Sequence, residues 1–228
     1  MPREETFERE LQYLKDEVLA LGSMVENTIT DSVEILKQRD MEGSRRLIAQ
    51  DRRINGKRFA IEADTLALIA IHQPVASDLH TLAAILHIAS ELERIGDYAK
   101  GIARINLMIG EGPLIKPLVD LPRMAAKARD MLHRALEAFV QRDANLARAI
   151  PAEDDEIDAL YDQVYRELLT FIMANPRNID QANYLQWAAH NLERTADRVT
   201  NICERVVFTV TGEMVELDVR DSGVENLA

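Results

Sequence analysis

The sequence predicts an all-α protein built as two tandem three-helix bundles. Three observations predict this fold: a helix-forming composition, apolar residues spaced every three or four positions, and a pattern that recurs after a linker rich in glycine and proline. The 228 residues include only 9 Gly, 7 Pro and 5% aromatic side chains. This composition is typical of helical bundles and disfavours β-sandwiches and barrels.

The first helix is predicted by apolar residues that fall on one face of a long helix. They are Phe7, Leu11, Leu14, Val18, Leu21, Val25, Ile29, Val33 and Leu36. Asp40 then supplies an N-cap for a second helix, which Pro74 closes. The apolar residues of this second helix are Leu47, Ile48, Ile54, Phe59, Ile61, Leu66 and Ile69.

A third helix can start near Pro74, because proline is tolerated in a first helical turn. Its apolar positions are Leu79, Leu82, Ile85, Leu86, Ala89, Leu92 and Ile102. The helix ends before the run Gly110-Glu111-Gly112-Pro113, which is predicted to be a linker.

Beyond this linker the pattern returns. Gln38-Arg39-Asp40 reappears as Gln141-Arg142-Asp143, an offset of 141 − 38 = 103 residues. The block 92–97, Leu-Glu-Arg-x-x-Asp, reappears at 192–197, an offset of 192 − 92 = 100 residues. We therefore expect a first repeat over residues 1–110, a second over 111–212 and an acidic tail over 213–228.

Six main helices are expected, with breaks near residues 40, 72, 112, 142 and 175. Pro151 should kink the fifth helix or delay its start to the acidic run 153–156, which makes a good first turn.

Composition also excludes several classes of function. The formal net charge of -12 disfavours nucleic acid as a partner. The charged opening segment does not resemble a signal peptide, and the apolar run 66–71 is too short to span a membrane. We therefore expect a cytoplasmic protein. The arginines between residues 45 and 58 are interleaved with acidic residues, and we interpret them as a solvated helix face.

Three further side chains are predicted to lie in the core. Cys203 is the single cysteine and lies on an apolar helical stripe, so packing is its expected role. Trp187 and Tyr184 also fall among apolar helical positions, which favours a core placement over a ligand-binding one.

Two carboxylate pairs are the strongest candidates for chemistry. Glu93 and Asp97 are four residues apart, so they lie one helical turn apart on the same side, and Glu193 and Asp197 repeat this spacing. Like charges beside an apolar stripe need a compensating cation. A metal would supply one, because carboxylates on facing helices build iron or manganese sites and hard oxygen donors suit magnesium.

An ordinary ion-pair interpretation remains open beside the metal interpretation. Arg94 or Arg104 could neutralise Glu93. In the second repeat, Arg194 or Arg198 could neutralise Glu193.

Six segments form a distinctive set of motifs: 7–11 (FEREL), 22–26 (GSMVE), 73–79 (QPVASDL), 91–97 (ELERIGD), 191–198 (NLERTADR) and 201–204 (NICE). Together they resemble the PhoU family of phosphate-transport accessory proteins. The resemblance implies two tandem three-helix bundles, a homo-oligomer such as a dimer, and multinuclear sites for a metal cation such as iron, zinc or magnesium. It implies a non-enzymatic negative regulator of phosphate uptake and of the phosphate-starvation response. The implied partners are the ATPase subunit of the phosphate ABC transporter and a sensor histidine kinase.

The resemblance also implies a set of metal ligands. In the first repeat they are Asn27, Asp31, Glu93 and Asp97. In the second repeat they are Asp130, Glu193 and Asp197. The position that matches Asp31 is Arg134, so an arginine could replace a metal as the counter-charge there.

Two other functions remain open. The same carboxylates could hold a redox-active or hydrolytic metal in a helical-bundle enzyme, although no Glu-x-x-His pair is present. Alternatively, the protein could be a purely structural adaptor whose acidic motifs are paired to basic side chains.

Overall fold

The computed structural model describes residues 3–217, and in this part of the chain all regular structure is helical. The long helices are α1 (Arg3–Gln38), α2 (Met41–His72), α3 (Ser77–Ile109), α4 (Asp120–Gln141), α6 (Asp154–Ala174) and α7 (Ile179–Thr211). A short helix, α5 (Ala144–Ala149), and two 3₁₀ turns, Ile150–Glu153 and Pro176–Asn178, complete the chain. The predicted all-α class, the six main helices and their five breaks are confirmed.

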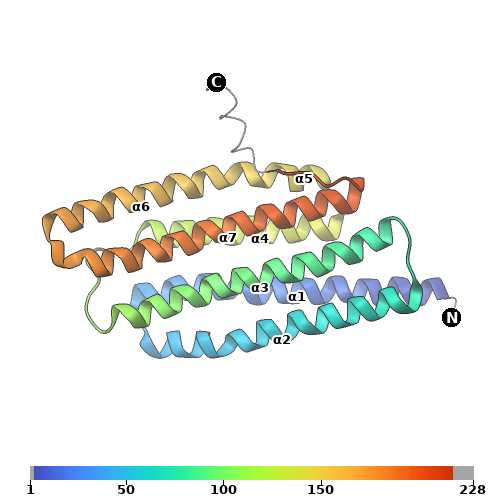
Figure 1. Ribbon diagram of the computed structural model, residues 1–228, viewed down its shortest axis with the longest axis horizontal. Helices are drawn as coiled ribbons and strands as arrows, with labels where there is room; N and C mark the ends of the chain where they lie inside the picture. The colour runs from blue at the N-terminus through green and yellow to red at the C-terminus, as the bar shows by residue number, and fades with distance from the viewer. Residues whose placement is uncertain (1–2, 218–228) are drawn as a thin grey trace, which may run out of the picture.

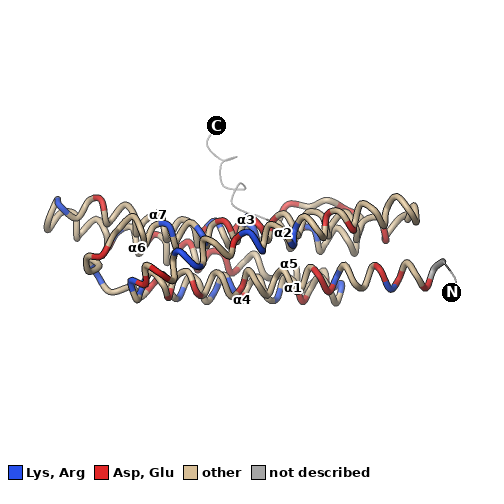
Figure 2. Tube along the Cα trace, turned by 90° about the horizontal axis from the view of Figure 1, so that it is seen from below, with Lys and Arg blue, Asp and Glu red and all other residues tan. Residues whose placement is uncertain are grey.

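The helices form two bundles that lie side by side. One bundle contains α1, α2 and α3, and the other contains α4 to α7 (Figure 1). The bundles join where α3 packs against α7 and α1 packs against α4. Figure 2 shows α1 and α4 in one layer and α2, α3, α6 and α7 in the other. Consequently α2 and α6 lie on opposite outer edges, and within the described chain α2 packs against α1 and α3 alone.

The predicted apolar face of α1 is buried, as its three- and four-residue spacing requires. From Leu14 to Leu36 its seven apolar positions are all at most 3% exposed. In α2 the prediction is only partly right. Leu47, Ile54 and Ile61 are buried, whereas Phe59 and Leu66 are each 58% exposed. These two residues lie on the outer edge of the molecule, where no other helix covers them.

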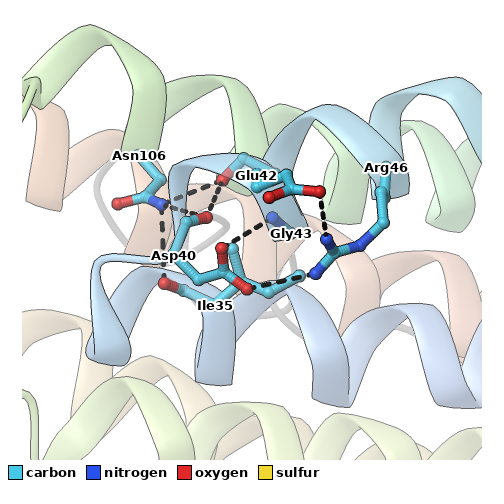
Figure 3. Close-up of polar contacts among 7 residues, drawn as sticks. Ile35, Asp40, Glu42, Gly43, Arg46 and Asn106 are labelled. Atoms are coloured by element: carbon cyan, nitrogen blue, oxygen red, sulfur yellow. Dashed lines mark hydrogen bonds and ion pairs between the residues drawn. The ribbon is translucent and has the colours of Figure 1, made fainter.

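A buried asparagine fixes the corner between α1 and α2 (Figure 3). Asn106 of α3 donates hydrogen bonds to the carbonyl oxygens of Ile35 and Asp40 and to the Ser44 hydroxyl, at 3.4, 3.2 and 2.9 Å. The Asp40 carboxylate accepts a 2.7 Å hydrogen bond from the amide of Gly43, which confirms Asp40 as the N-cap of α2. Arg39 reaches across to Asn106, so the end of α1 is tied to the end of α3.

The second repeat has a similar corner. Asp143 caps α5 through the amides of Asn145 and Leu146, at 2.9 and 3.0 Å. Arg142, the counterpart of Arg39, donates a 2.8 Å hydrogen bond to the Thr209 carbonyl of α7. Both arginines have left-handed backbone angles, with φ of 59° and 55°.

Pro151 has the effect predicted for it. The chain continues past α5 through the 3₁₀ turn Ile150–Glu153, and α6 begins at Asp154. The acidic residues that follow lie in the first turn of α6, where the helix dipole favours negative charge.

The structure confirms one core prediction and contradicts another. Cys203 is fully buried, and burial raises the pKa of its thiol to about 12. Trp187, by contrast, is 53% exposed, and the ring of Tyr184 lies edge-on to it, 5.8 Å between centroids. The core face of α7 contains Leu185 and Ala189. Trp187 lies two residues from each of them, which turns it about 200° away from that face.

No helix in the described range 3–217 is long and apolar enough to cross a membrane. Residues 212–217, which follow α7, are non-helical, and the amide of Leu217 donates a 3.1 Å hydrogen bond to Glu204. The rest of the predicted acidic tail, residues 218–228, lies outside the described residues.

Candidate functional site

A cavity of about 170 Å³ opens where the three helices of the first bundle meet. Asn27 and Asp31 of α1 line it, as do Asp51 of α2 and Gly96 and Lys100 of α3. The structure therefore brings together the two ligands predicted on the first helix. Glu93 and Asp97 do not line this cavity.

Lys100 connects the cavity to the carboxylate pair on α3. Its ammonium group lies 2.8 Å from Asp51 Oδ2 and also forms an ion pair with Asp97. Burial alone would lower the pKa of Lys100, but its hydrogen bonds to Asp51 and Asp97 raise the pKa above the usual value. A lysine therefore occupies the position between these two carboxylates.

The chemistry of the oxygens at this site fits a hard cation. Asp51 is largely buried, with a side chain 12% exposed, and its Oδ2 accepts hydrogen bonds from Lys100 and from Asn55 at 2.8 and 3.1 Å. Its other oxygen, Oδ1, is buried and has no hydrogen-bond partner among the described residues. A buried carboxylate oxygen with a free lone pair can accept a metal ion.

Glu93 experiences the repulsion expected of its position. Burial raises the pKa of Glu93, and the neighbouring charge of Asp97 raises it further. Arg58 and Lys100 act in the opposite direction but do not cancel the effect. Neutralising this pair more fully would favour the charged form of Glu93.

In the second bundle, basic side chains engage the corresponding acidic groups. Arg134 lies 3.0 Å from Asp130 Oδ2 and 2.7 Å from Glu153 Oε1. Lys127 lies 2.6 Å from Glu156 and 3.5 Å from Glu153. The predicted role of Arg134 as a counter-charge is therefore correct for Asp130, because the guanidinium group bridges this residue and the turn before α6.

The second carboxylate pair on α7 lies apart from these contacts. His190 Nδ1 lies 3.2 Å from Glu193 Oε2, and Arg194 Nε lies 3.9 Å from Asp197 Oδ2. Burial raises the pKa of Glu193, and Asp197 and Asp158 raise it further. The same repulsion thus exists in both repeats.

Two of the four arginines that the sequence suggested as partners, Arg94 and Arg198, contact Glu91 instead. Arg94 lies 3.8 Å from Glu91, and Arg198 of α7 lies 3.5 Å from the same Glu91 carboxylate. Lys100 is the cation that contacts the first acidic cluster. Among residues 3–217, no three His, Cys, Asp or Glu side chains converge closely enough to hold a metal ion. In this arrangement Lys100 and Arg134 occupy carboxylate oxygens that a metal ion could otherwise bind.

Sequence reasoning missed two important members of the first cluster, Asp51 and Lys100. Asp51 recurs as Asp154 at the 103-residue offset, and this repetition was the signal that could have identified it. Lys100 follows Asp97 by three residues, so the same helical spacing that paired the carboxylates also places this lysine beside them.

Comparison with known proteins agrees with this architecture. The model of the PhoU domain matches the chain twice, over residues 18–105 and 121–206. The phosphate-specific transport system accessory protein PhoU of Edwardsiella tarda is 35% identical over 97% of this chain and 89% of its own. The PhoU homolog of Deinococcus radiodurans is 35% identical over 91% of this chain and 98% of its own.

Solved structures show the same similarity. The crystal structure of the phosphate transport system regulatory protein PhoU from Streptococcus pneumoniae superposes with a TM-score of 0.85 and 33% identity, covering 92% of this chain and 99% of that one. PhoU from Pseudomonas aeruginosa gives a TM-score of 0.83 and 33% identity, covering 91% and 100%. The sequence matches and the shared fold together show that this chain is a member of the PhoU family.

Proposed function

We propose that the protein is a non-enzymatic negative regulator of a phosphate-specific transport system and of the phosphate-starvation response. Family membership carries this proposal, because relatives that align over nearly the whole chain are named as accessory or regulatory proteins of phosphate transport. Its partners would be the ATPase subunit of the phosphate transporter and a sensor histidine kinase, which it would meet in the cytoplasm as a homodimer.

The acidic cluster of the first repeat would make this regulation responsive to a metal cation. The unpartnered Asp51 Oδ1 and the raised pKa of Glu93 support a site where added positive charge is favourable. The cation would be held by Asn27, Asp31 and Asp51, with Glu93 and Asp97 nearby once Lys100 turns away. Lys100 and a metal would then compete for the same carboxylates, so cation concentration would set which one is bound.

A second candidate is a structural adaptor that never binds metal. Lys100 between Asp51 and Asp97 favours it, since these ion pairs already compensate much of the negative charge. In that case the acidic clusters would stabilise the bundle, and docking to partners would use other surfaces.

Deleting the gene and complementing it with a tagged copy tests the regulatory proposal. In phosphate-replete medium the deletion strain should express phosphate-starvation genes, and the tagged copy should restore repression. A pull-down from the same cells should contain the transporter ATPase or the kinase. Normal repression in the deletion strain would contradict the proposal.

A further inference from the structure

The outward face of α2 is unusually apolar for a helix on the edge of the molecule. From residue 59 to residue 71, eight side chains are exposed and only Asp64 among them is polar. The other seven are Phe59, Ala60, Ala63, Leu66, Ala67, Ala70 and Ile71. The opposite side of the same segment faces the core through Ile61 and Leu68, so this half of α2 is apolar nearly all round. Such helices are normally covered on every side.

The second repeat provides an internal comparison. Helix α6 occupies the corresponding edge, and at the 103-residue offset residues 162–174 match 59–71. Half of the eight exposed side chains there are polar, namely Asp162, Gln163, Arg166 and Thr170, and half are apolar, namely Tyr165, Leu169, Met173 and Ala174. An edge helix of this fold can therefore carry several polar side chains over the same stretch. The face of α2 has one polar side chain among eight, so it is more apolar than the general architecture requires.

Gly56 supplies a second, independent indication. It lies on the exposed face in the middle of α2, and a Cβ atom added there would meet nothing within 4 Å. Glycine in a helix interior costs roughly 0.5–1 kcal/mol relative to alanine. Nothing within the described chain requires this cost. A glycine on an open helix face does, however, permit the close approach of another backbone.

The small residues of this face follow a regular spacing. They alternate at four- and three-residue steps along a single line, the pattern of a two-helix coiled-coil seam. The members are Ala49, Gly56, Ala60, Ala63, Ala67 and Ala70, with Arg46 and Arg53 completing the line. From residue 46 to residue 70 the line is about 37 Å long, at 1.5 Å per residue.

We propose that this face is the surface through which two copies of the chain pair, with their α2 helices antiparallel about a two-fold axis level with residue 58. In this register Gly56 lies opposite Ala60 of the second copy, and Ala49 lies opposite Ala67 of the second copy. Small residues therefore oppose each other at these two levels, whereas Arg53 and Arg46 lie opposite Ala63 and Ala70 of the second copy, so each long side chain faces a small one. Phe59 of each copy lies beside the axis and covers the seam.

Charge complementarity indicates that the partner bound to this face of α2 is a second copy of the chain. Arg53 and Asp64 are both exposed, and neither has a hydrogen bond or ion pair within residues 3–217. The antiparallel register places Arg53 next to Asp64 of the second copy, and symmetry repeats this pair on the other side of the axis. An arrangement in which each surface carries both partners of the ion pair is self-complementary. This inference deepens the proposed homodimer by naming its surface.

Substituting Gly56 tests the proposal without threatening the fold. Gly56→Glu places a charge at the seam, yet position 56 is exposed, a Cβ atom there meets nothing within 4 Å and Glu forms helix better than Gly. Analytical ultracentrifugation should show a wild-type dimer and a dimerisation constant weakened at least about tenfold by the variant, because symmetry brings both new charges to the axis. The matched control is Ala159→Glu, at the equivalent position of α6, and should leave the dimer intact. A monomeric wild type, or a dimerisation constant that Gly56→Glu does not change, would overturn the proposal.

Disulfide cross-linking tests the direction and register of pairing. Cys203 is buried and will not interfere. A mixture of Ala49→Cys and Ala67→Cys chains should form a cross-linked heterodimer, whereas each variant alone should not, because identical positions lie about 27 Å apart in this register. Cross-linking of Ala49→Cys with itself would show parallel pairing and reject the proposed geometry. Neither experiment depends on phosphate regulation, so this proposal can fail while the proposed function stands.

Discussion

Lys100 of α3 holds Asp51 of α2 at 2.8 Å and Asp97 of its own helix at the same time, so one ammonium group neutralises carboxylates from two helices. This contact determines which cation compensates the negative charge of the first acidic cluster. Without a metal the lysine is the compensating cation. With a metal bound, the lysine would compete with the metal for these carboxylates.

Replacing Lys100 should separate its stabilising effect on the metal-free protein from its competition with a bound cation. Lys100→Met should destabilise the metal-free protein by about 1–2 kcal/mol, because Asp51 is left largely buried without its partner. The same change should strengthen divalent-cation binding, because the competitor is gone. Thermal melts in chelator and with added Mg²⁺ or Zn²⁺ measure both effects.

Lys57→Met is the matched control for this lysine, since Lys57 forms an ion pair with Glu17 at 2.7 Å outside the cavity. It should leave cation binding unchanged. Equal cation binding by wild type and Lys100→Met would show that Lys100 and metal do not share a site.

The raised pKa of Glu93 predicts a particular pH dependence. The folded chain holds this proton to a higher pH than the unfolded chain does, so the group lowers stability as pH rises through and above its unfolded pKa. Glu93→Gln should therefore raise Tm at pH 7 in chelator, by about 1–2 °C if the repulsion from Asp97 is of ordinary size.

The advantage of Glu93→Gln should shrink as the pH falls through and below the unfolded pKa of a glutamate, about 4.3, because the carboxyl then becomes protonated in both states. Melting curves across this range provide the measurement. A stabilisation that is independent of pH would point to a cause other than ionisation.

The two repeats should differ in cation affinity. Arg134 bridges Asp130 and Glu153 with a guanidinium group that does not lose its charge, whereas the lysine of the first repeat is a flexible point charge. Titration calorimetry on Glu93→Ala/Asp97→Ala and on Glu193→Ala/Asp197→Ala should show the larger loss of binding in the first double variant. Equal losses, or a loss confined to the second, would refute this asymmetry.

The corner at Asn106 should be important for stability. Asn106 is fully buried and donates to Ile35 of α1, to the N-cap residue Asp40 and to Ser44 of α2, so Asn106→Ala removes the hydrogen bonds that join α3 to this corner. The expected loss is about 2 kcal/mol, or several degrees in Tm. Asn183→Ala, on the exposed face of α7, is the control and should change Tm little. A similar change in Tm for both variants would show that the hydrogen bonds of Asn106 do not contribute specially to stability.

Helical periodicity predicted the fold because every long helix has at least one side against another helix. It could not show which side of α2 would face solvent, since Phe59 and Leu66 extend its apolar pattern around the helix. The core prediction for Trp187 was wrong for a related reason. Its apolar residue type suggested burial, but its angular position on α7 places it outside the core face.

The candidate site was partly predictable for the same kind of reason. Spacing within one helix identified Glu93 with Asp97, because four residues make about one turn. The contact of Lys100 with Asp51 joins two helices and is set by how α2 packs on α3. A sequence pattern along one helix carries no information about that packing.

The double variant Glu93→Ala/Asp97→Ala, assayed in cells and in solution, tests the cation-dependent regulator most directly. Alanine is the best helix former, so the helices should persist. The measurement is expression of a phosphate-starvation reporter in phosphate-replete medium, with Tm of the purified variant in metal-containing buffer beside it. We expect loss of repression together with loss of the stabilisation that metal supplies. Normal repression by a variant that melts higher than wild type and binds no less metal would contradict the proposal and favour a structural adaptor.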